Sequence, residues 1–149
     1  MSVLGNLGEE IKAAMKARDA LRLETLRAIK KELLEARTAK NAGGEVSEEN
    51  EIKLLQKMVK QRRDSADIYN AQGRADLSEK ELMEADIIGA YLPKQLTFEE
   101  LESAVKKIIA SENATSMKDM GKVMAAASSQ LAGKADGKDI SQMVKRLLS

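Results

Sequence analysis

The chain has 149 residues, of which 25 are Lys or Arg and 24 are Asp or Glu, so its formal net charge is +1. It contains no His, no Cys and no Trp, which excludes imidazole bases, thiolate nucleophiles, disulfides and the ordinary zinc sites. With 33% charged residues, 43% hydrophobic residues and one Pro, the composition predicts an all-α globular protein rather than a disordered one.

Apolar residues recur at helical spacing from the start of the chain, and they predict four helices before Pro93. The first helix ends near Arg18. Asp19 is the expected N-cap of the second helix, which runs to about Lys40 and is broken by residues 41–44.

The third and fourth helices have recognisable starts. Ser47 begins the third helix, which stops at Gly73. Ser78-Glu-Lys-Glu81 has the form of a capping box and is expected to begin a short fourth helix with Leu82 on its inner face.

Three more helices follow. The capping box Thr97-Phe-Glu-Glu100 predicts a fifth helix from Phe98. Ser116-Met-Lys-Asp119 opens a sixth helix that ends at Gly133, and Asp136 caps a seventh. The sixth helix is expected to turn Met117, Met120 and Met124 inward as core filling, with an adaptable partner-binding groove as the alternative.

The segment Tyr91-Leu-Pro-Lys-Gln-Leu96 is the best domain boundary, because Pro93 cannot extend the helix before it. We therefore predict an N-terminal helical domain over 1–92 and a C-terminal helical domain over 93–149. No stretch approaches the ~20 apolar residues of a membrane span, and the N-terminus lacks the features of a secretory signal, so we expect a cytoplasmic protein with no membrane partner.

No arrangement of residues predicts catalysis. Glu81 and Glu84 share a helix face, but they fall in a predicted first turn, where acidic residues oppose the helix dipole. The stretch Gly133–Lys138 lacks the spacing of a phosphate-binding loop and fits the junction of two helices. We expect no catalytic residue, no metal and no cofactor.

Basic residues are concentrated near the C-terminus, where residues 115–149 hold six basic side chains against three acidic ones. A local excess of this kind neutralises nucleic-acid phosphates, although a solvated charged face is equally expected from the charges alone. A second basic stripe lies on the predicted third helix. The residues in question are Lys118, Lys122, Lys134, Lys138, Lys145 and Arg146, and in the third helix Lys53, Lys57, Lys60, Arg62 and Arg63.

Six short motifs together resemble the stand-alone GatB/YqeY family over almost the whole chain. They are Leu23-x-x-Leu-Arg27, Lys60-Gln-Arg-Arg-Asp-Ser65, Gly73-Arg-x-Asp-Leu77, Tyr91–Leu96, Ser116–Met124 and Gly133–Lys138. The resemblance implies an all-α fold of two helical domains. It also implies that the C-terminal domain is similar to the tail of the B subunit of the tRNA-dependent amidotransferase, a carbon–nitrogen ligase that uses glutamine as amide donor.

In that enzyme the tail helps to hold tRNA, and separate large domains carry the chemistry. The resemblance therefore implies a non-catalytic tRNA-binding accessory module, with tRNA and a protein of aminoacyl-tRNA metabolism as expected partners. Lys118, Lys122, Lys134 and Lys138 stand in matching motif positions and are the expected phosphate contacts. The alternative is a protein-interaction adaptor that uses the Met-rich C-terminal face or the basic third helix; an enzyme of the amidotransferase class is a third hypothesis.

Overall fold

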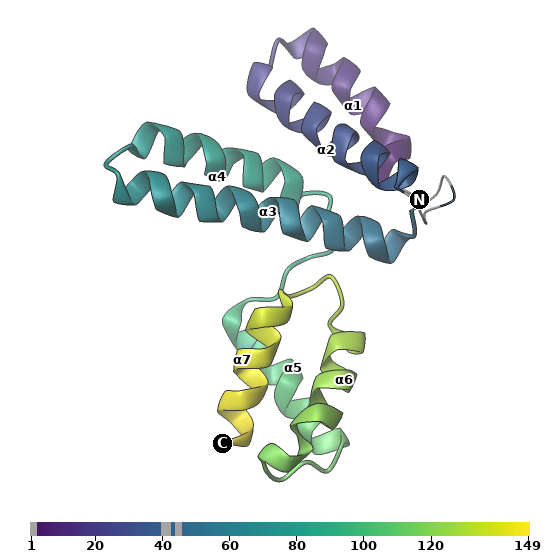
Figure 1. The fold of residues 1–149 in the computed structure, drawn as a ribbon, viewed down its shortest axis with the longest axis vertical. Coiled ribbons are helices and arrows are strands. Elements are labelled where there is room, and N and C mark those ends of the chain that lie inside the picture. The colour runs from purple at the N-terminus through teal and green to yellow at the C-terminus, as the bar shows by residue number, and fades with distance from the viewer. Residues whose placement is uncertain (1–2, 40–42, 44–45) are drawn as a thin grey trace. The chain divides into compact units, whose positions relative to one another are not determined.

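The computed structural model describes residues 3–39, 43 and 46–149, and within these ranges the chain is helical and has no strand (Figure 1). The prediction of an all-α fold is confirmed. By its internal contacts the chain divides into two compact units, Met1–Leu92 and Pro93–Ser149, which we call the N-terminal and C-terminal units.

The N-terminal unit contains two helical hairpins, one formed by α1 and α2 and the other by α3 and α4 (Figure 1). The predicted N-caps are present, because Asp19 accepts a hydrogen bond from the Arg22 backbone N–H at 3.1 Å and Ser47 accepts one from Asn50 at 3.2 Å. The predicted break over 41–44 lies outside the described residues except for Gly43. The helices are α1 Val3–Ala17, α2 Ala20–Thr38, α3 Glu48–Ala71 and α4 Ala75–Gly89.

Helix α4 begins one turn earlier than the sequence predicts, and the capping role expected for Ser78 is wrong. The Ser78 backbone N–H donates to the Arg74 carbonyl at 3.1 Å, as in a helix interior, and the residue is only 2% exposed. Gly73, at φ +73°, reverses the chain directly after α3. Packing of α4 along α3 therefore outweighs the local capping signal.

The residues of α4 that face inward also differ in part from the prediction, because packing against α3 decides which face is buried. Leu82, expected in the core, is 44% exposed, whereas Glu84 is buried. The buried core of the N-terminal unit is drawn from all four helices. It consists of Leu7, Ala14, Leu26, Ile29, Leu33, Leu55, Met58, Val59, Ala85 and Ile88.

The C-terminal unit consists of three α-helices and one 3-10 turn: α5 Phe98–Ser111, η1 Met117–Asp119, α6 Met120–Gln130 and α7 Gly137–Leu148 (Figure 1). The capping box of α5 is confirmed, with Thr97 and Glu100 exchanging two hydrogen bonds of 3.1 Å. Ser116 caps the 3-10 turn instead of the helix itself. As a result Met117 is 43% exposed, and its predicted inward orientation is wrong.

The three α-helices of the C-terminal unit enclose a second buried core, which shares no residue with the first. It consists of Leu101, Val105, Ile108, Val123, Ala127, Leu131, Ile140, Met143, Val144 and Leu148. Each core is made within one unit. The surface residues of each unit are therefore supported by the packed core of that same unit.

Candidate nucleic-acid interface

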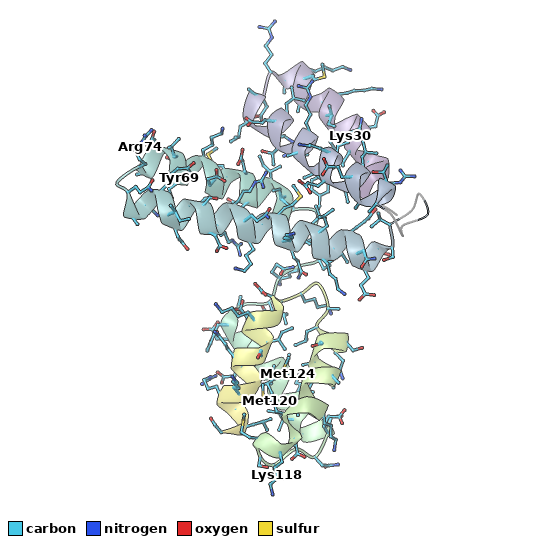
Figure 2. The ribbon with its side chains drawn as sticks, viewed as in Figure 1. Lys30, Tyr69, Arg74, Lys118, Met120 and Met124 are labelled. Atoms are coloured by element: carbon cyan, nitrogen blue, oxygen red, sulfur yellow. The ribbon has the colours of Figure 1, made fainter. Side chains whose placement is uncertain are left out.

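Of the first two predicted phosphate contacts, Lys118 lies in the 3-10 turn η1 and Lys122 in the first turn of α6, and both are exposed. Lys118 extends from the end of the C-terminal unit that lies away from the α6–α7 loop (Figure 2). Between the two lysines, Asp119 accepts a hydrogen bond from the Thr115 backbone N–H at 2.9 Å. That bond, aided by the charge of Lys122, lowers the pKa of Asp119, so its carboxylate stays ionised and bound to the backbone.

The other two, Lys134 and Lys138, lie at the junction of α6 and α7 and are also exposed. The junction is ordered by its own backbone. Gly133 is buried at φ +77°, and the Lys134 N–H donates to the Leu131 carbonyl at 2.9 Å. Asp136 then caps α7 by accepting from the Lys138 backbone N–H at 3.0 Å, as the sequence predicts.

The four lysines form two pairs rather than one cluster. Helix α6 has 11 residues, and at about 1.5 Å of rise per residue its ends lie about 16 Å apart. The exposed residues of α6 between the pairs are mostly small, and they include Gly121, Ala125 and Ser128. A Cβ added at Gly121 would meet no atom within 4 Å, so this face of α6 is open.

These four lysines pair with no carboxylate anywhere in the part of the chain that the structure describes. The ion pairs of the C-terminal unit centre instead on Glu102, which contacts Lys106 at 3.0 Å and also Arg146. Hydrogen bonds from these two cations lower the pKa of Glu102. The Arg146 guanidinium in addition lies 5.3 Å from the centre of the Phe98 ring. Arg146 is therefore held by its neighbours, whereas the lysines remain available.

The basic residues of α3 take part in more ion pairs than the four lysines of the C-terminal unit. Lys53 pairs with Glu49 and Lys60 pairs with Asp64, each at 3.2 Å, which leaves Lys57 without such a partner among the described residues. Neighbouring carboxylates therefore offset two of the three lysine charges of this stripe. That makes α3 a weaker candidate for phosphate binding than the C-terminal unit.

The acid pair Glu81 and Glu84 does not occupy a first turn, because α4 begins at Ala75. Glu84 is 7% exposed and its carboxylate lies 3.7 Å from the Arg62 guanidinium of α3. Burial, together with the charge of Glu81, raises the pKa of Glu84, while Arg62 acts in the opposite direction. Sequence reasoning missed this pair because it depends on the true start of α4.

Of the three methionines predicted to face inward from the sixth helix, two pack against the core and one is exposed. Met120 and Met124 are half-buried and pack against the core of the C-terminal unit (Figure 2), as core filling requires. Met117, in the 3-10 turn, remains exposed.

A further contact joins the start of α5 to the α6–α7 junction. The Gln95 side-chain amide donates to two backbone carbonyls, those of Pro93 at 2.7 Å and Gly133 at 2.6 Å. The Leu96 backbone N–H donates to the Lys134 carbonyl at 2.9 Å. Sequence reasoning placed Gln95 in a boundary motif, but no local pattern indicates a partner 38 residues away.

The described ranges contain no group of three or more acidic side chains arranged to hold a metal ion. No helix there is both long enough and apolar enough to span a membrane.

Comparison with known proteins relates the chain to one family. The family described as "Yqey-like protein" matches residues 5–148. The curated protein "Altered inheritance of mitochondria protein 41, mitochondrial" of Clavispora lusitaniae (strain ATCC 42720) is 37% identical over 91 residues, which are 61% of this chain and 52% of the relative. The match thus spans about half the length of that relative.

Proposed function

The chain belongs to the family of YqeY-like proteins, and on that premise we propose that it is a non-catalytic module that binds tRNA. The observation that supports the proposal is the set of four exposed lysines of the C-terminal unit, Lys118, Lys122, Lys134 and Lys138, none of which is paired with a carboxylate among the described residues. Unpaired ammonium groups are free to replace the counterions of an RNA backbone.

The spacing of the lysines fits a folded RNA. Two pairs of cations at the two ends of α6, a helix of 11 residues and so about 16 Å long, suit contacts to phosphates at two points of an RNA helix. Aromatic residues make up only 2% of the chain, so stacking on splayed bases is a minor contribution at most. Recognition then rests on shape and backbone.

We propose the accessory role from the motifs Ser116–Met124 and Gly133–Lys138, by which the C-terminal unit resembles the tail of the tRNA-dependent amidotransferase B subunit. The chain has no His or Cys to act as base or nucleophile. Among the described residues the one buried acid with a raised pKa, Glu84, faces Arg62. We propose that the protein acts in the cytoplasm as an accessory to aminoacyl-tRNA metabolism. A fluorescent fusion imaged in its own cells tests the location.

Fluorescence anisotropy with labelled tRNA, measured over a series of salt concentrations, tests the proposal. Four phosphate contacts give a slope of log K against log salt of about −3 to −4. The double variant Lys134→Glu/Lys138→Glu is expected to weaken binding at least about tenfold at low salt while its circular dichroism stays helical.

The matched control is Lys30→Glu/Lys31→Glu, which makes the same charge change at two exposed positions of α2. An equal loss in the control would assign the effect to net charge and not to the C-terminal unit. No detectable binding of tRNA by the unchanged chain at low salt would contradict the proposal.

A protein-interaction adaptor is the second candidate function, and the observation behind it is the first residue of α5, Phe98, whose apolar side chain is 60% exposed. A stoichiometric protein complex that survives nuclease treatment and is lost in Phe98→Ala supports this candidate. Recovery of RNA alone counts against it.

A further inference from the structure

The segment that precedes α5 is fastened to the α6–α7 junction by two hydrogen bonds, which we call the Gln95 bridge. The Gln95 side-chain amide donates to the Gly133 carbonyl at 2.6 Å, and the Leu96 N–H donates to the Lys134 carbonyl at 2.9 Å. The same Gln95 amide also donates to the Pro93 carbonyl within its own segment, at 2.7 Å. Residues 94–96 and 133–134 therefore run next to each other. Figure 1 shows the two segments at the same end of the C-terminal unit.

One consequence of the Gln95 bridge is that a lysine of the segment before α5, Lys94, lies near the α6–α7 junction. Lys94 directly precedes Gln95, as Lys134 directly follows Gly133, and both lysines are exposed. Lys138, in the first turn of α7, is exposed as well. In the ranges given above none of the three has an ion-pair partner. We call Lys94, Lys134 and Lys138 the junction lysines.

The Lys134 backbone is held at both of its polar groups. Its N–H donates to the Leu131 carbonyl and its carbonyl accepts from the Leu96 N–H, each at 2.9 Å. The residue before it, Gly133, is buried and has its carbonyl fixed by Gln95. A cation on an ordered backbone loses less conformational entropy when it binds an anion than one on a free loop.

The carboxylates in the first turns of α5 and α7 also affect anion binding at the junction. Glu100 accepts from the Thr97 N–H at 3.1 Å, a bond that lowers its pKa, with the charge of Lys94 adding to the effect. Asp136 accepts from the Lys138 N–H. Both are thus turned to backbone donors at helix starts. Asp139, exposed in the first turn of α7, and Glu99, exposed in the first turn of α5, are the acids that oppose an approaching anion.

We propose that the junction lysines form one binding surface for the phosphodiester backbone of RNA, and that Gln95 is the positioning residue that holds Lys94 beside Lys134. The proposal rests on the proposed function and adds to it a contact, Lys94, and a cause for the geometry. An acidic protein segment is the competing occupant, and the experiment below separates the two.

The first arm measures tRNA binding by full-length Lys94→Ala over a series of salt concentrations. Loss of one phosphate contact makes the slope of log K against log salt shallower by about 0.7 to 0.9, and Lys94→Arg restores it. Lys107→Ala, an exposed lysine of α5, is the matched control. If tRNA binds and Lys94→Ala behaves as Lys107→Ala does, this inference is overturned while the proposed function stands.

The second arm tests the positioning role of Gln95. Gln95→Ala removes both side-chain donors, so it is expected to weaken tRNA binding and to speed hydrogen exchange at the Leu96 amide. Because Gln95 acts through Lys94, the double variant Gln95→Ala/Lys94→Ala should have the same affinity for tRNA as whichever single variant binds tRNA less tightly. Fully additive losses, or a lower melting temperature with an unchanged salt slope, would contradict the positioning role.

The third arm identifies the occupant. Labelled poly-glutamate, which presents carboxylates in place of phosphates, is titrated under the same conditions as tRNA. Binding to tRNA alone supports an RNA backbone, whereas equal sensitivity of both ligands to Lys94→Ala overturns it in favour of an acidic protein. If the unchanged chain binds no tRNA at all, the proposed function fails first, and that result is distinguishable from a Lys94 variant without effect.

Discussion

Arg62 and Glu84 show how a single pair of residues can be misassigned when a helix start is misplaced. The sequence predicts that Glu84 is an acid of a first helical turn, where its charge interacts with the helix dipole. In the structure Glu84 is instead a buried carboxylate 3.7 Å from the Arg62 guanidinium. Arg62 belongs to the motif Lys60–Ser65, so this ion pair gives one motif residue a structural role, joining α3 to α4. Burial raises the pKa of Glu84 more than the cation lowers it.

The raised pKa of Glu84 predicts a specific pH dependence of stability. A carboxyl with a higher pKa in the folded than in the unfolded state binds its proton more tightly when folded. Its contribution to the free energy of unfolding is therefore present below the ordinary value of 4.5 and is lost as pH rises through the raised value. In Glu84→Gln this decline should be absent, as measured by urea unfolding from pH 4 to pH 7.

Other carboxylates contribute to the pH dependence with the opposite sign, so the test is the difference between two proteins. The pKa values of Glu100, Glu102 and Asp119 are lowered, and each of these groups adds stability as pH rises. Glu79→Gln, an exposed glutamate of α4, is the control and should keep the slope of the unchanged protein. If the free energy of unfolding of Glu84→Gln varied with pH in parallel with that of the unchanged chain, the burial of Glu84 would make no contribution to the pH dependence of stability.

At the scale of the helices, local capping signals were reliable where a loop precedes the helix. Thr97 and Glu100 exchange their two hydrogen bonds at the start of α5. Ser78-Glu-Lys-Glu81 has the same pattern, but the chain is already helical at Ala75, since Gly73 reverses it directly after α3. The same four-residue pattern is therefore a cap in one helix and an interior turn in the other.

This contrast predicts opposite outcomes for two similar substitutions. Thr97→Ala removes a cap and should lower the free energy of unfolding by about 1 kcal/mol. Ser78→Ala removes no cap and places a strong helix former inside α4, so its effect should stay within about 0.5 kcal/mol. Denaturant titrations followed by circular dichroism compare them, and an equal loss in both variants would return Ser78 to the capping role.

The helices were largely predictable from the sequence because their signals are local. The 3.6-residue apolar period and the caps Asp19, Ser47 and Asp136 need only a few neighbouring residues to be read. The orientation of Met117 was not predictable in the same way, because a 3-10 turn and an α-helix share the start Ser116 but turn at different rates.

The candidate site was predictable only in part. Four lysines could be named from motif positions, but their division into two pairs follows from the ends of α6. Lys94 could not be named, because what brings it to Lys134 is a pair of hydrogen-bonded segments distant in sequence. Periodicity and capping carry no information about such a contact.

At the scale of the whole molecule, the chain holds two separate buried cores and an uneven charge. The core residues of Met1–Leu92 and those of Pro93–Ser149 form two distinct sets. The near-neutral total of +1 conceals the excess of basic side chains over residues 115–149. A chain built this way can change the surface of one unit with little effect on the packing of the other.

Core truncations test whether the two units are stabilised independently. Leu55→Ala in α3 and Ile108→Ala in α5 each remove a buried side chain and should cost about 2–5 kcal/mol. Hydrogen exchange read by mass spectrometry should show faster exchange in residues 46–92 for the first variant and in residues 93–149 for the second. Acceleration across both units in either variant would show that they unfold together.

The Gln95 bridge also determines when the junction is completed during synthesis. Residues 1–92 leave the ribosome first and contain every residue of their own core, so they can fold while the rest is being made. Gln95 follows almost at once, but its acceptor on Gly133 is made 38 residues later. The cationic junction is therefore among the last features to be completed, and a chain released early, before Gly133, lacks it while retaining a foldable N-terminal unit.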